Sequence, residues 1–195
     1  VFLYPRASFP ERIAVYDPCG GLPGIGECFR ALRLAEGDEI PGDCAALVST
    51  LYSDRVQRFL ENGGRVVLVQ NGDGALPVVH APMWREDMFR AFDHPIFREI
   101  PQGYELDDLR YFSMTADVAF DPKGMPGEDV TPVLRRYDCR QWTVSDYLAT
   151  FRVGRGLCVA TTLRLGGGMG RAASGVSNNP FAAYLLREML RATGV

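Results

Sequence analysis

The sequence predicts an α/β fold in which a mostly parallel sheet ends in an antiparallel hairpin. A continuous apolar run at 66–69 lies between glycine pairs, as in a strand that is buried on both faces of a parallel sheet. Strand-like and helix-like segments alternate through residues 12–74, which is the pattern of βαβ units. Near the C-terminus, strand-like segments at 146–153 and 157–163 flank the turn Gly154-Arg155-Gly156, which indicates a hairpin.

The composition is that of a globular protein and argues against several classes of function. The 195 residues suffice for one domain with a substantial core. A net charge of -3 gives no electrostatic basis for binding nucleic acid or an anionic membrane. The five cysteines are odd in number and lack CxxC spacing, which argues against a disulfide framework or a zinc site. We therefore expect no metal, no cofactor and reduced thiols, which favour a cytoplasmic setting.

The N-terminal part of the chain is expected to alternate strands with helices. Strands are expected at 12–18, 45–50 and 65–70. Apolar residues recur at helical spacing within 25–34, which predicts a helix with one buried face. A second helix is expected to begin at Ser53 or Asp54 and to run through Leu60, because Asn62-Gly63-Gly64 follows as a stop signal.

Residues 75–108 are predicted to form an irregular insertion that covers the carboxyl end of the sheet as a lid. Prolines interrupt this stretch, and aromatic and methionine side chains supply large apolar anchors. A short helix is expected at 85–92 and a packed turn at 94–97. Short strands are expected at 111–114 and 117–120.

The last third of the chain supplies the antiparallel part of the sheet and the closing helix. Alternating apolar and polar residues at 131–137 predict a strand, which the hairpin strands follow. The final helix is expected to begin at Asn179, with Pro180 in its first turn and an apolar stripe that reaches Leu190.

Three stretches resemble a known family: His94-Pro95-Ile96-Phe97 with Ile100-Pro101, the hairpin 153–163 and the segment 179–190. They are similar to segments of the class I glutamine-amidotransferase-like superfold. More narrowly, they resemble its trehalose-utilisation-type branch and the related domains attached to glycoside hydrolases. The resemblance covers residues 12–190 and implies a flavodoxin-like three-layer sandwich with a mostly parallel central sheet and a C-terminal antiparallel hairpin.

The first residues carry a second resemblance. Val1-Phe2-Leu3-Tyr4-Pro5 is similar to the strand that closes a β-sandwich in some bacterial glycoside hydrolase family 2-type chains, where an amidotransferase-like domain comes next. This resemblance implies that residues 1–10 lead in from a preceding domain. Residues 11–195 would then form the amidotransferase-like domain, with the insertion at 75–108 inside it. The other domains of such a parent chain would be its partners.

The residues that an amidotransferase needs for catalysis are missing from their expected places. Such an enzyme uses a cysteine on a strained turn after a central strand and a histidine that deprotonates it. On the resemblance, the equivalent turn is Asn71-Gly72-Asp73-Gly74, which holds neither cysteine nor serine. Arg164 stands where the distal histidine is expected. We therefore expect no catalytic residue in this chain, and hydrolysis of a glycoside would take place elsewhere in the parent chain.

The candidate binding residues are expected near the carboxyl end of the sheet, where ligands of open α/β sheets lie. They are Asp17, Cys19, Asn71, Asp73, His80, Trp84 and Arg164. Carboxylates with a histidine suit a metal or general-base site, and the flat ring of Trp84 or Trp142 suits a sugar. The alternative is structural: Asp17 and Asp73 would cap turns, and both tryptophans would pack in the core or the lid. His94, which precedes a proline, is expected to make a turn hydrogen bond.

Two functions from different classes follow from these observations. The first is a non-catalytic accessory domain of a bacterial glycoside hydrolase, which shapes the cleft, binds carbohydrate or makes a homo-oligomer contact. The second is an autonomous sugar-metabolism enzyme of the trehalose-utilisation type, with a polar or metal site at the carboxyl end of the sheet. A nucleotide or flavin site in the glycine-rich loop 19–26 is a third alternative, although its glycines depart from GxGxxG spacing.

Overall fold

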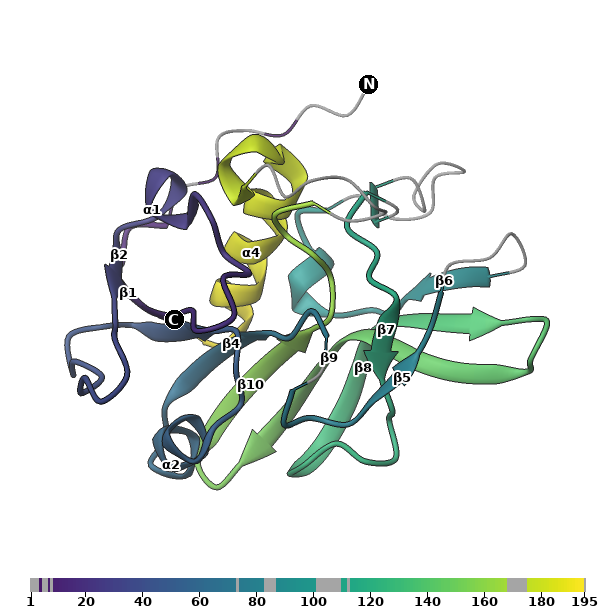
Figure 1. Ribbon diagram of the computed structural model, residues 1–195, viewed down its shortest axis with the longest axis horizontal. Coiled ribbons are helices and arrows are strands. Elements are labelled where there is room, and N and C mark those ends of the chain that lie inside the picture. The colour runs from purple at the N-terminus through teal and green to yellow at the C-terminus, as the bar shows by residue number, and fades with distance from the viewer. Residues whose placement is uncertain are drawn as a thin grey trace.

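The strands form one mixed sheet in the computed structural model, which describes residues 4, 7, 9–72, 74–82, 87–100, 110–111, 113–167 and 175–194 (Figure 1). The strands are β1 (Ile13–Tyr16), β2 (Ala31–Arg33), β3 (Ala46–Ser49), β4 (Arg65–Val69), β5 (Val78–His80), β6 (Asp87–Ala91), β7 (Val118–Phe120), β8 (Glu128–Asp138), β9 (Thr143–Val153) and β10 (Gly156–Thr161). The helices are α1 (Ile25–Cys28), α2 (Asp54–Glu61) and α4 (Pro180–Ala192), with the 3-10 turns η1 (Pro95–Phe97) and η2 (Val176–Asn178). The strand order is β2-β1-β3-β4-β10-β9-β7-β5, while β8 pairs with β9 and β6 with β8.

The parallel half of the sheet consists of β2, β1, β3, β4 and β10. A row of four valines crosses it, because Val15 pairs with Val48, Val48 with Val67, and Val67 with Val159. All four side chains are buried, as the continuous apolar runs predict for strands covered on both faces. The predicted strands at 12–18, 45–50 and 65–70 are thus confirmed as β1, β3 and β4.

The C-terminal hairpin places β10 between β4 and β9. Val153 pairs with Gly156 across the two-residue turn Gly154-Arg155, and Gly154 has a φ of 56°. A Cβ atom on Gly154 would lie 2.8 Å from the carbonyl oxygen of Glu61 at the end of α2, so glycine is required there for space as well as for conformation. The predicted hairpin is confirmed.

The antiparallel half of the sheet extends past the carboxyl ends of the parallel strands. One row of paired residues runs from Val69 through Thr161, Leu148 and Leu134 to Ala91, so the last residues of β4, β10 and β6 are level. Beyond this row, β6, β8 and β9 continue without β4 and β10 beside them. β7 takes the place of β10 against β9, where Phe120 pairs with Asp146, and β5 pairs with β7.

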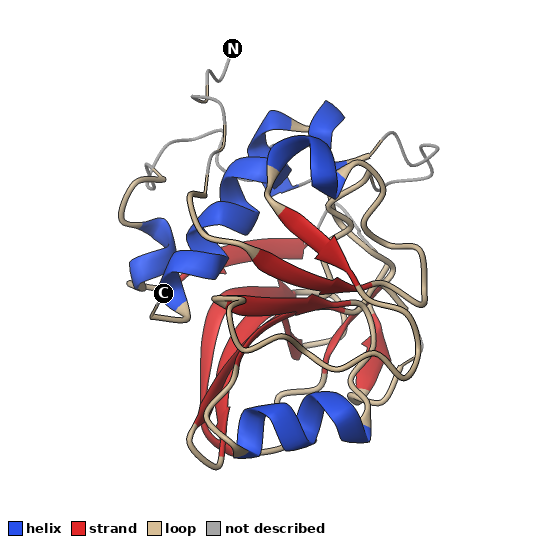
Figure 2. Cartoon of the chain, turned by 90° about the vertical axis from the view of Figure 1, so that its left-hand side faces the viewer, coloured by secondary structure: helices blue, strands red, loops and turns tan. Residues whose placement is uncertain are grey.

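Helices cover both faces of the sheet, which gives three layers (Figure 2). On one face, α4, α1 and η1 enclose the larger core, with Leu185 and Leu186 fully buried. On the other face, α2 packs through Val56 and Leu60. The expected start of α4 is confirmed, because Asn179 Oδ1 accepts a hydrogen bond from the Ala182 amide at 3.2 Å and Pro180 occupies the first turn. No helix in the described part of the chain is both long and apolar enough to cross a membrane.

The predicted helix at 25–34 is wrong beyond its first turn. Only α1 is helical, and Ala31–Arg33 forms the edge strand β2 parallel to β1. The helical spacing rests on few residues and includes Gly26, which lowers helix propensity. β2 instead forms backbone hydrogen bonds with the edge of β1 that does not face β3.

Two predictions in the middle of the chain are also wrong. Within 85–92, the described residues form the strand β6, in which Phe89 and Ala91 pack on the core while Met88 and Arg90 face solvent. This is the two-residue period of a strand. At 111–114, Tyr111 is helical and residues 113–114 form a turn, in which the Met114 amide donates to the Tyr111 carbonyl. The strand expected at 117–120 is confirmed as β7, and that at 131–137 as part of β8.

Candidate functional site

Asp17 lies directly after β1 and organises the loop that follows it. Its carboxylate accepts hydrogen bonds from the amides of Gly21 at 2.8 Å and Leu22 at 3.1 Å. It also accepts one from the hydroxyl of Thr50, at the end of β3, at 3.0 Å. The Thr50 hydroxyl in turn accepts a hydrogen bond from the Cys19 amide at 3.2 Å. The carboxylate therefore ties two neighbouring strand ends together, as expected of a residue that caps a turn.

Asn71 lies after β4, close to the Asp17 loop. Its amide nitrogen donates to the carbonyl oxygens of Thr162 at 3.3 Å and Leu163 at 3.0 Å, just beyond β10. Its side-chain oxygen faces Gly21, where an added Cβ would be 3.1 Å away. The structure therefore brings Asp17 and Asn71 into one cluster at the carboxyl ends of β1, β3, β4 and β10.

The buried residue Gln70, which the sequence did not single out, holds the turn after β4. Its side chain accepts a hydrogen bond from the Leu76 amide at 3.2 Å and donates to the Leu76 carbonyl at 2.9 Å. It also donates to the Gly72 carbonyl at 3.2 Å. Gln70 is 1% exposed, so these bonds replace those that water would make. The glutamine at the end of an apolar run was the available signal, because a buried amide needs partners.

His80 lies apart from the Asp17 cluster, whereas Arg164 directly follows Leu163, whose carbonyl accepts from Asn71. His80 ends β5 and is exposed, and β5 is separated from β4 by β10, β9 and β7 in the sheet order. Arg164 follows β10, and its Nη2 lies 3.8 Å from an Asp117 carboxylate oxygen just before β7. This exposed pair contributes little stability. Two further candidates, Asp73 and Trp84, fall outside the described residues.

Cys19 is exposed on the loop after β1, and all five cysteines are free thiols. In the described part of the chain, no hydrogen bond or ion pair joins the Cys19 thiol to a base. Cys158 lies inside the sheet, where burial raises the pKa of its thiol. Among the described residues, no three His, Cys, Asp or Glu side chains are grouped as metal ligands would be.

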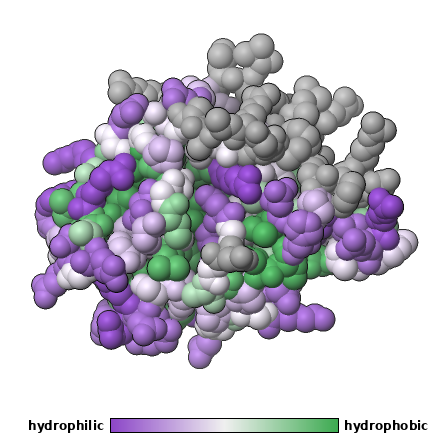
Figure 3. All heavy atoms as spheres, in the orientation of Figure 1, coloured by the Kyte–Doolittle hydropathy of each residue, from purple (hydrophilic) through white to green (hydrophobic). Residues whose placement is uncertain are grey.

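The prediction that Trp142 packs in the core or the lid is wrong. Its side chain is 89% exposed in the turn between β8 and β9. Its φ of 56° is unusual for a bulky residue. Met88 and Val144 are exposed beside this turn, and each pairs with Tyr137 of β8. The face of the molecule in Figure 3 is mixed, with hydrophilic residues around smaller hydrophobic areas.

A groove of about 650 Å³ lies outside the cluster at the strand ends. It is lined by residues from the end of β6 to just beyond the η1 turn: Ala91, Phe92, Asp93, His94, Pro95, Phe97, Arg98 and Ile100. Its volume is within the range of small-molecule pockets. The sequence identified His94 as a turn residue, and its Nδ1 does accept a hydrogen bond from the Ile96 amide at 3.3 Å. The charges of Asp93 and Arg98 around this turn were the signal that sequence reasoning passed over.

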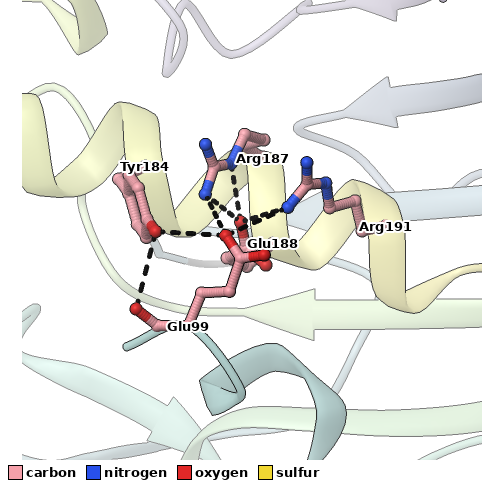
Figure 4. Close-up of polar contacts among 5 residues, drawn as sticks. All are labelled: Glu99, Tyr184, Arg187, Glu188 and Arg191. Atoms are coloured by element: carbon pink, nitrogen blue, oxygen red, sulfur yellow. Dashed lines mark hydrogen bonds and ion pairs between the residues drawn. The ribbon is translucent and has the colours of Figure 1, made fainter. Parts of the chain in front are cut away.

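A charged network anchors the far end of the groove segment to α4 (Figure 4). Glu99 Oε2 accepts hydrogen bonds from Arg187 at 3.0 Å, Arg191 at 3.2 Å and the Tyr184 hydroxyl at 3.3 Å. Arg187 also donates to Glu188 at 2.6 Å, and its guanidinium carbon lies 3.9 Å from the centre of the Tyr184 ring. Arg187 and Glu188 are almost fully buried, so each charge depends on the other.

The fold and these sites define a mixed α/β domain whose polar residues at the strand ends mainly hold the loops in place. No protein-family model matches the chain, and no curated protein does. Solved structures that are similar to it include a cold-adapted β-galactosidase from Rahnella sp. R3, with 9% sequence identity and a TM-score of 0.50. That likeness covers 94% of this chain but only 31% of the β-galactosidase chain.

A second similar structure is a protein described as ThuA-like from Parabacteroides merdae ATCC 43184. It is 12% identical, with a TM-score of 0.52, over 95% of this chain and 90% of that one. At such low identity, both likenesses concern the fold. The second supports the flavodoxin-like fold that the family resemblance implies.

Proposed function

We propose that this chain is a non-catalytic accessory domain of a glycoside hydrolase. In this role it shapes the catalytic cleft, binds carbohydrate or makes a contact between copies of the parent protein. The observation that carries the proposal is the turn after β4, where a nucleophile would stand in an amidotransferase. This chain has Asn71 there, and the Asn71 amide is committed to the carbonyl oxygens of Thr162 and Leu163.

The partners of Asp17 support the same proposal. The Asp17 carboxylate accepts three hydrogen bonds from its own loop and from Thr50, which occupy three of its roughly four acceptor sites and make it a weaker general base. The likeness to 31% of a β-galactosidase chain adds a context in which such a domain accompanies a separate catalytic part. Glycan hydrolysis would then be performed by the rest of the parent polypeptide.

The coding sequence upstream of Val1 tests this proposal directly. We expect it to encode a β-sandwich and a catalytic barrel in the same reading frame. A start codon within a few residues of Val1 would refute the proposal. The purified chain should also fail to release nitrophenol from nitrophenyl glycosides, whereas the full parent chain should release it.

A second function is favoured by one observation, namely that the ThuA-like protein is matched over 90% of its own length. This supports an autonomous sugar-metabolism protein with a polar site at the carboxyl end of the sheet. Such a protein should bind a metal ion or a small sugar in calorimetry, and Asp73→Ala should abolish that binding. Absence of binding across a panel of sugars and divalent metals would remove this alternative.

A further inference from the structure

The segment that lines the groove is anchored at both ends. The Phe92 amide donates to the Val133 carbonyl in β8 at 3.0 Å, which continues the sheet past β6. Ile96 and Ile100 are buried in the core beneath α4. Glu99 adds the charged tie to α4 that Figure 4 shows. Because its backbone is fixed before any ligand arrives, the groove would lose little conformational entropy on binding.

Phe92 forms a fixed aromatic part of the groove lining. The guanidinium carbon of Arg90 lies 4.8 Å from the centre of its ring, and that of Arg135 lies 5.6 Å away. Arg135 is itself held by two hydrogen bonds to Asp146, at 2.7 and 3.0 Å. These contacts restrict the ring, so the part of Phe92 that lines the groove has a defined position.

The groove has three polar side chains with hydrogen-bonding capacity that the fold does not use. Within the described residues, neither Asp93 nor Arg98 makes a side-chain hydrogen bond or ion pair, although both line the same groove. His94 uses Nδ1 to accept from the Ile96 amide, so its neutral ring carries the proton on Nε2 and can donate from there. The groove therefore offers an acceptor, a charged donor and a neutral donor.

We propose that this groove binds a pyranose ring of a neutral saccharide, with Asp93 and Arg98 hydrogen-bonded to its hydroxyl groups and the aromatic lining against its C–H face. Each sugar hydroxyl both donates and accepts, which suits a groove lined by both a carboxylate and a guanidinium. The apolar side of the ring matches Phe92 and Phe97. The inference deepens the proposed function, on which it rests, by assigning carbohydrate binding to a particular site.

The charges of the groove favour a neutral ligand over an ion. Asp93 and Arg98 have opposite charges, and burial lowers the pKa of His94, which keeps its ring neutral near pH 7. An anion would be attracted by Arg98 but repelled by Asp93. A cation would be attracted by Asp93 but repelled by Arg98. A purely apolar ligand would leave the carboxylate and the guanidinium without partners, at a cost in free energy.

Calorimetric titration of the whole chain tests the inference. The probes are methyl β-D-galactopyranoside, lactose and trehalose, with inorganic phosphate as the anionic probe. At least one saccharide should bind, and Asp93→Asn and Arg98→Ala should each weaken its binding about 10- to 100-fold, because each removes a charged hydrogen-bonding partner. Both residues are exposed, so the variants should fold.

Matched controls are Asp54→Asn and Arg58→Ala, the same two changes at exposed positions of α2 on the opposite face of the sheet. They should leave saccharide affinity unchanged. No binding by any of the three saccharides would overturn the inference. So would binding that is insensitive to Asp93→Asn and Arg98→Ala, or phosphate binding that depends on Arg98 and displaces the sugar.

Failure of this inference is distinguishable from failure of the proposed function. If the upstream sequence encodes a catalytic barrel but no saccharide binds, the accessory function stands and the groove assignment falls. If a saccharide binds in the groove but a start codon lies close to Val1, the groove assignment stands within the autonomous alternative. The two measurements are independent of each other.

Discussion

The carboxylate of Asp17 accepts a hydrogen bond from the Thr50 hydroxyl at 3.0 Å, and this contact joins the ends of β1 and β3. With the amides of Gly21 and Leu22 as further donors, Asp17 serves the loop as an internal cap. We expect Asp17→Ala to lower the free energy of unfolding by about 2 kcal/mol, because these donors lose their acceptor in a partly buried place. Urea denaturation followed by circular dichroism measures the change.

The control for Asp17 is Asp43→Ala. Asp43 pairs with Arg12 at 2.8 Å, but its side chain is 62% exposed, so its loss should cost at most about 0.5 kcal/mol. Equal effects of the two substitutions would contradict the capping role. An unchanged stability together with loss of ligand binding would instead make Asp17 a functional residue.

Trp142 stabilises the turn between β8 and β9 less than a smaller residue would. A side chain in the left-handed region costs about 1–2 kcal/mol, whereas asparagine tolerates that region. Because Trp142 is 89% exposed, its replacement loses little buried area. We expect Trp142→Asn to raise the free energy of unfolding by about 0.5–1 kcal/mol.

The comparison for Trp142 is Val144→Thr, a change at a neighbouring exposed position without positive φ. It should change stability by less than about 0.5 kcal/mol. If Trp142→Asn destabilises the chain in the same urea titration, the ring makes contacts that its exposure does not suggest.

Arg187 and Arg191 both contact Glu99 and Glu188 but differ in burial. The side chain of Arg187 is 8% exposed and that of Arg191 is 46% exposed. Arg187→Ala should destabilise the chain by about 3 kcal/mol, because the buried Glu188 loses its nearest countercharge. Arg191→Ala should cost about 1 kcal/mol or less. Thermal unfolding of both variants measures the two losses of stability. A larger loss of stability for Arg191→Ala than for Arg187→Ala would contradict the role of burial.

Stability should depend on pH through His94. Its half-buried position lowers the pKa of its ring below the usual 6.5, and the nearby charge of Asp93 offsets this only in part. The unfolded chain therefore takes up a proton near pH 6.5 while the folded chain does not. The contribution of His94 is complete above pH 6.5 and is lost as pH falls from 6.5 through the lower folded pKa.

His94→Asn should flatten the dependence of stability on pH in that window. The matched substitution is His80→Asn, at the only other histidine of the chain, which is exposed. Both variants are compared with the parent chain in urea titrations at a series of pH values. A slope that His94→Asn leaves unchanged would contradict the burial argument.

The central strands could be predicted from sequence because burial on both faces leaves an unmistakable apolar run at Val66–Val69. The edge strand β2 could not, since its three residues follow a short stretch with helical spacing and take strand form only where β1 offers a free edge. β6 alternates core-facing and exposed residues, but the prolines and aromatic residues around it obscure that short pattern.

The candidate site could also be predicted only in part. Polar residues after adjacent parallel strands meet by geometry, so Asp17 and Asn71 were predictable as neighbours. His80 was placed with them on the assumption that 75–108 covers the carboxyl end of the sheet as a lid, which stays a prediction. The groove segment is tied to α4 by the contact between Glu99 and Arg187, and no local sequence pattern predicts a contact between residues so distant in sequence.

The place of β10 has a consequence for how the protein is made. Arg65 in β4 pairs with Leu157 in β10, so the middle of the sheet cannot form until the hairpin of β9 and β10 has been made. A nascent chain that contains β4 but not yet β10 exposes the unpaired N–H and C=O groups of an apolar strand, an edge of the kind that pairs with other chains. Folding is then governed by contacts between distant segments, and the sheet is completed only after β10 has been made.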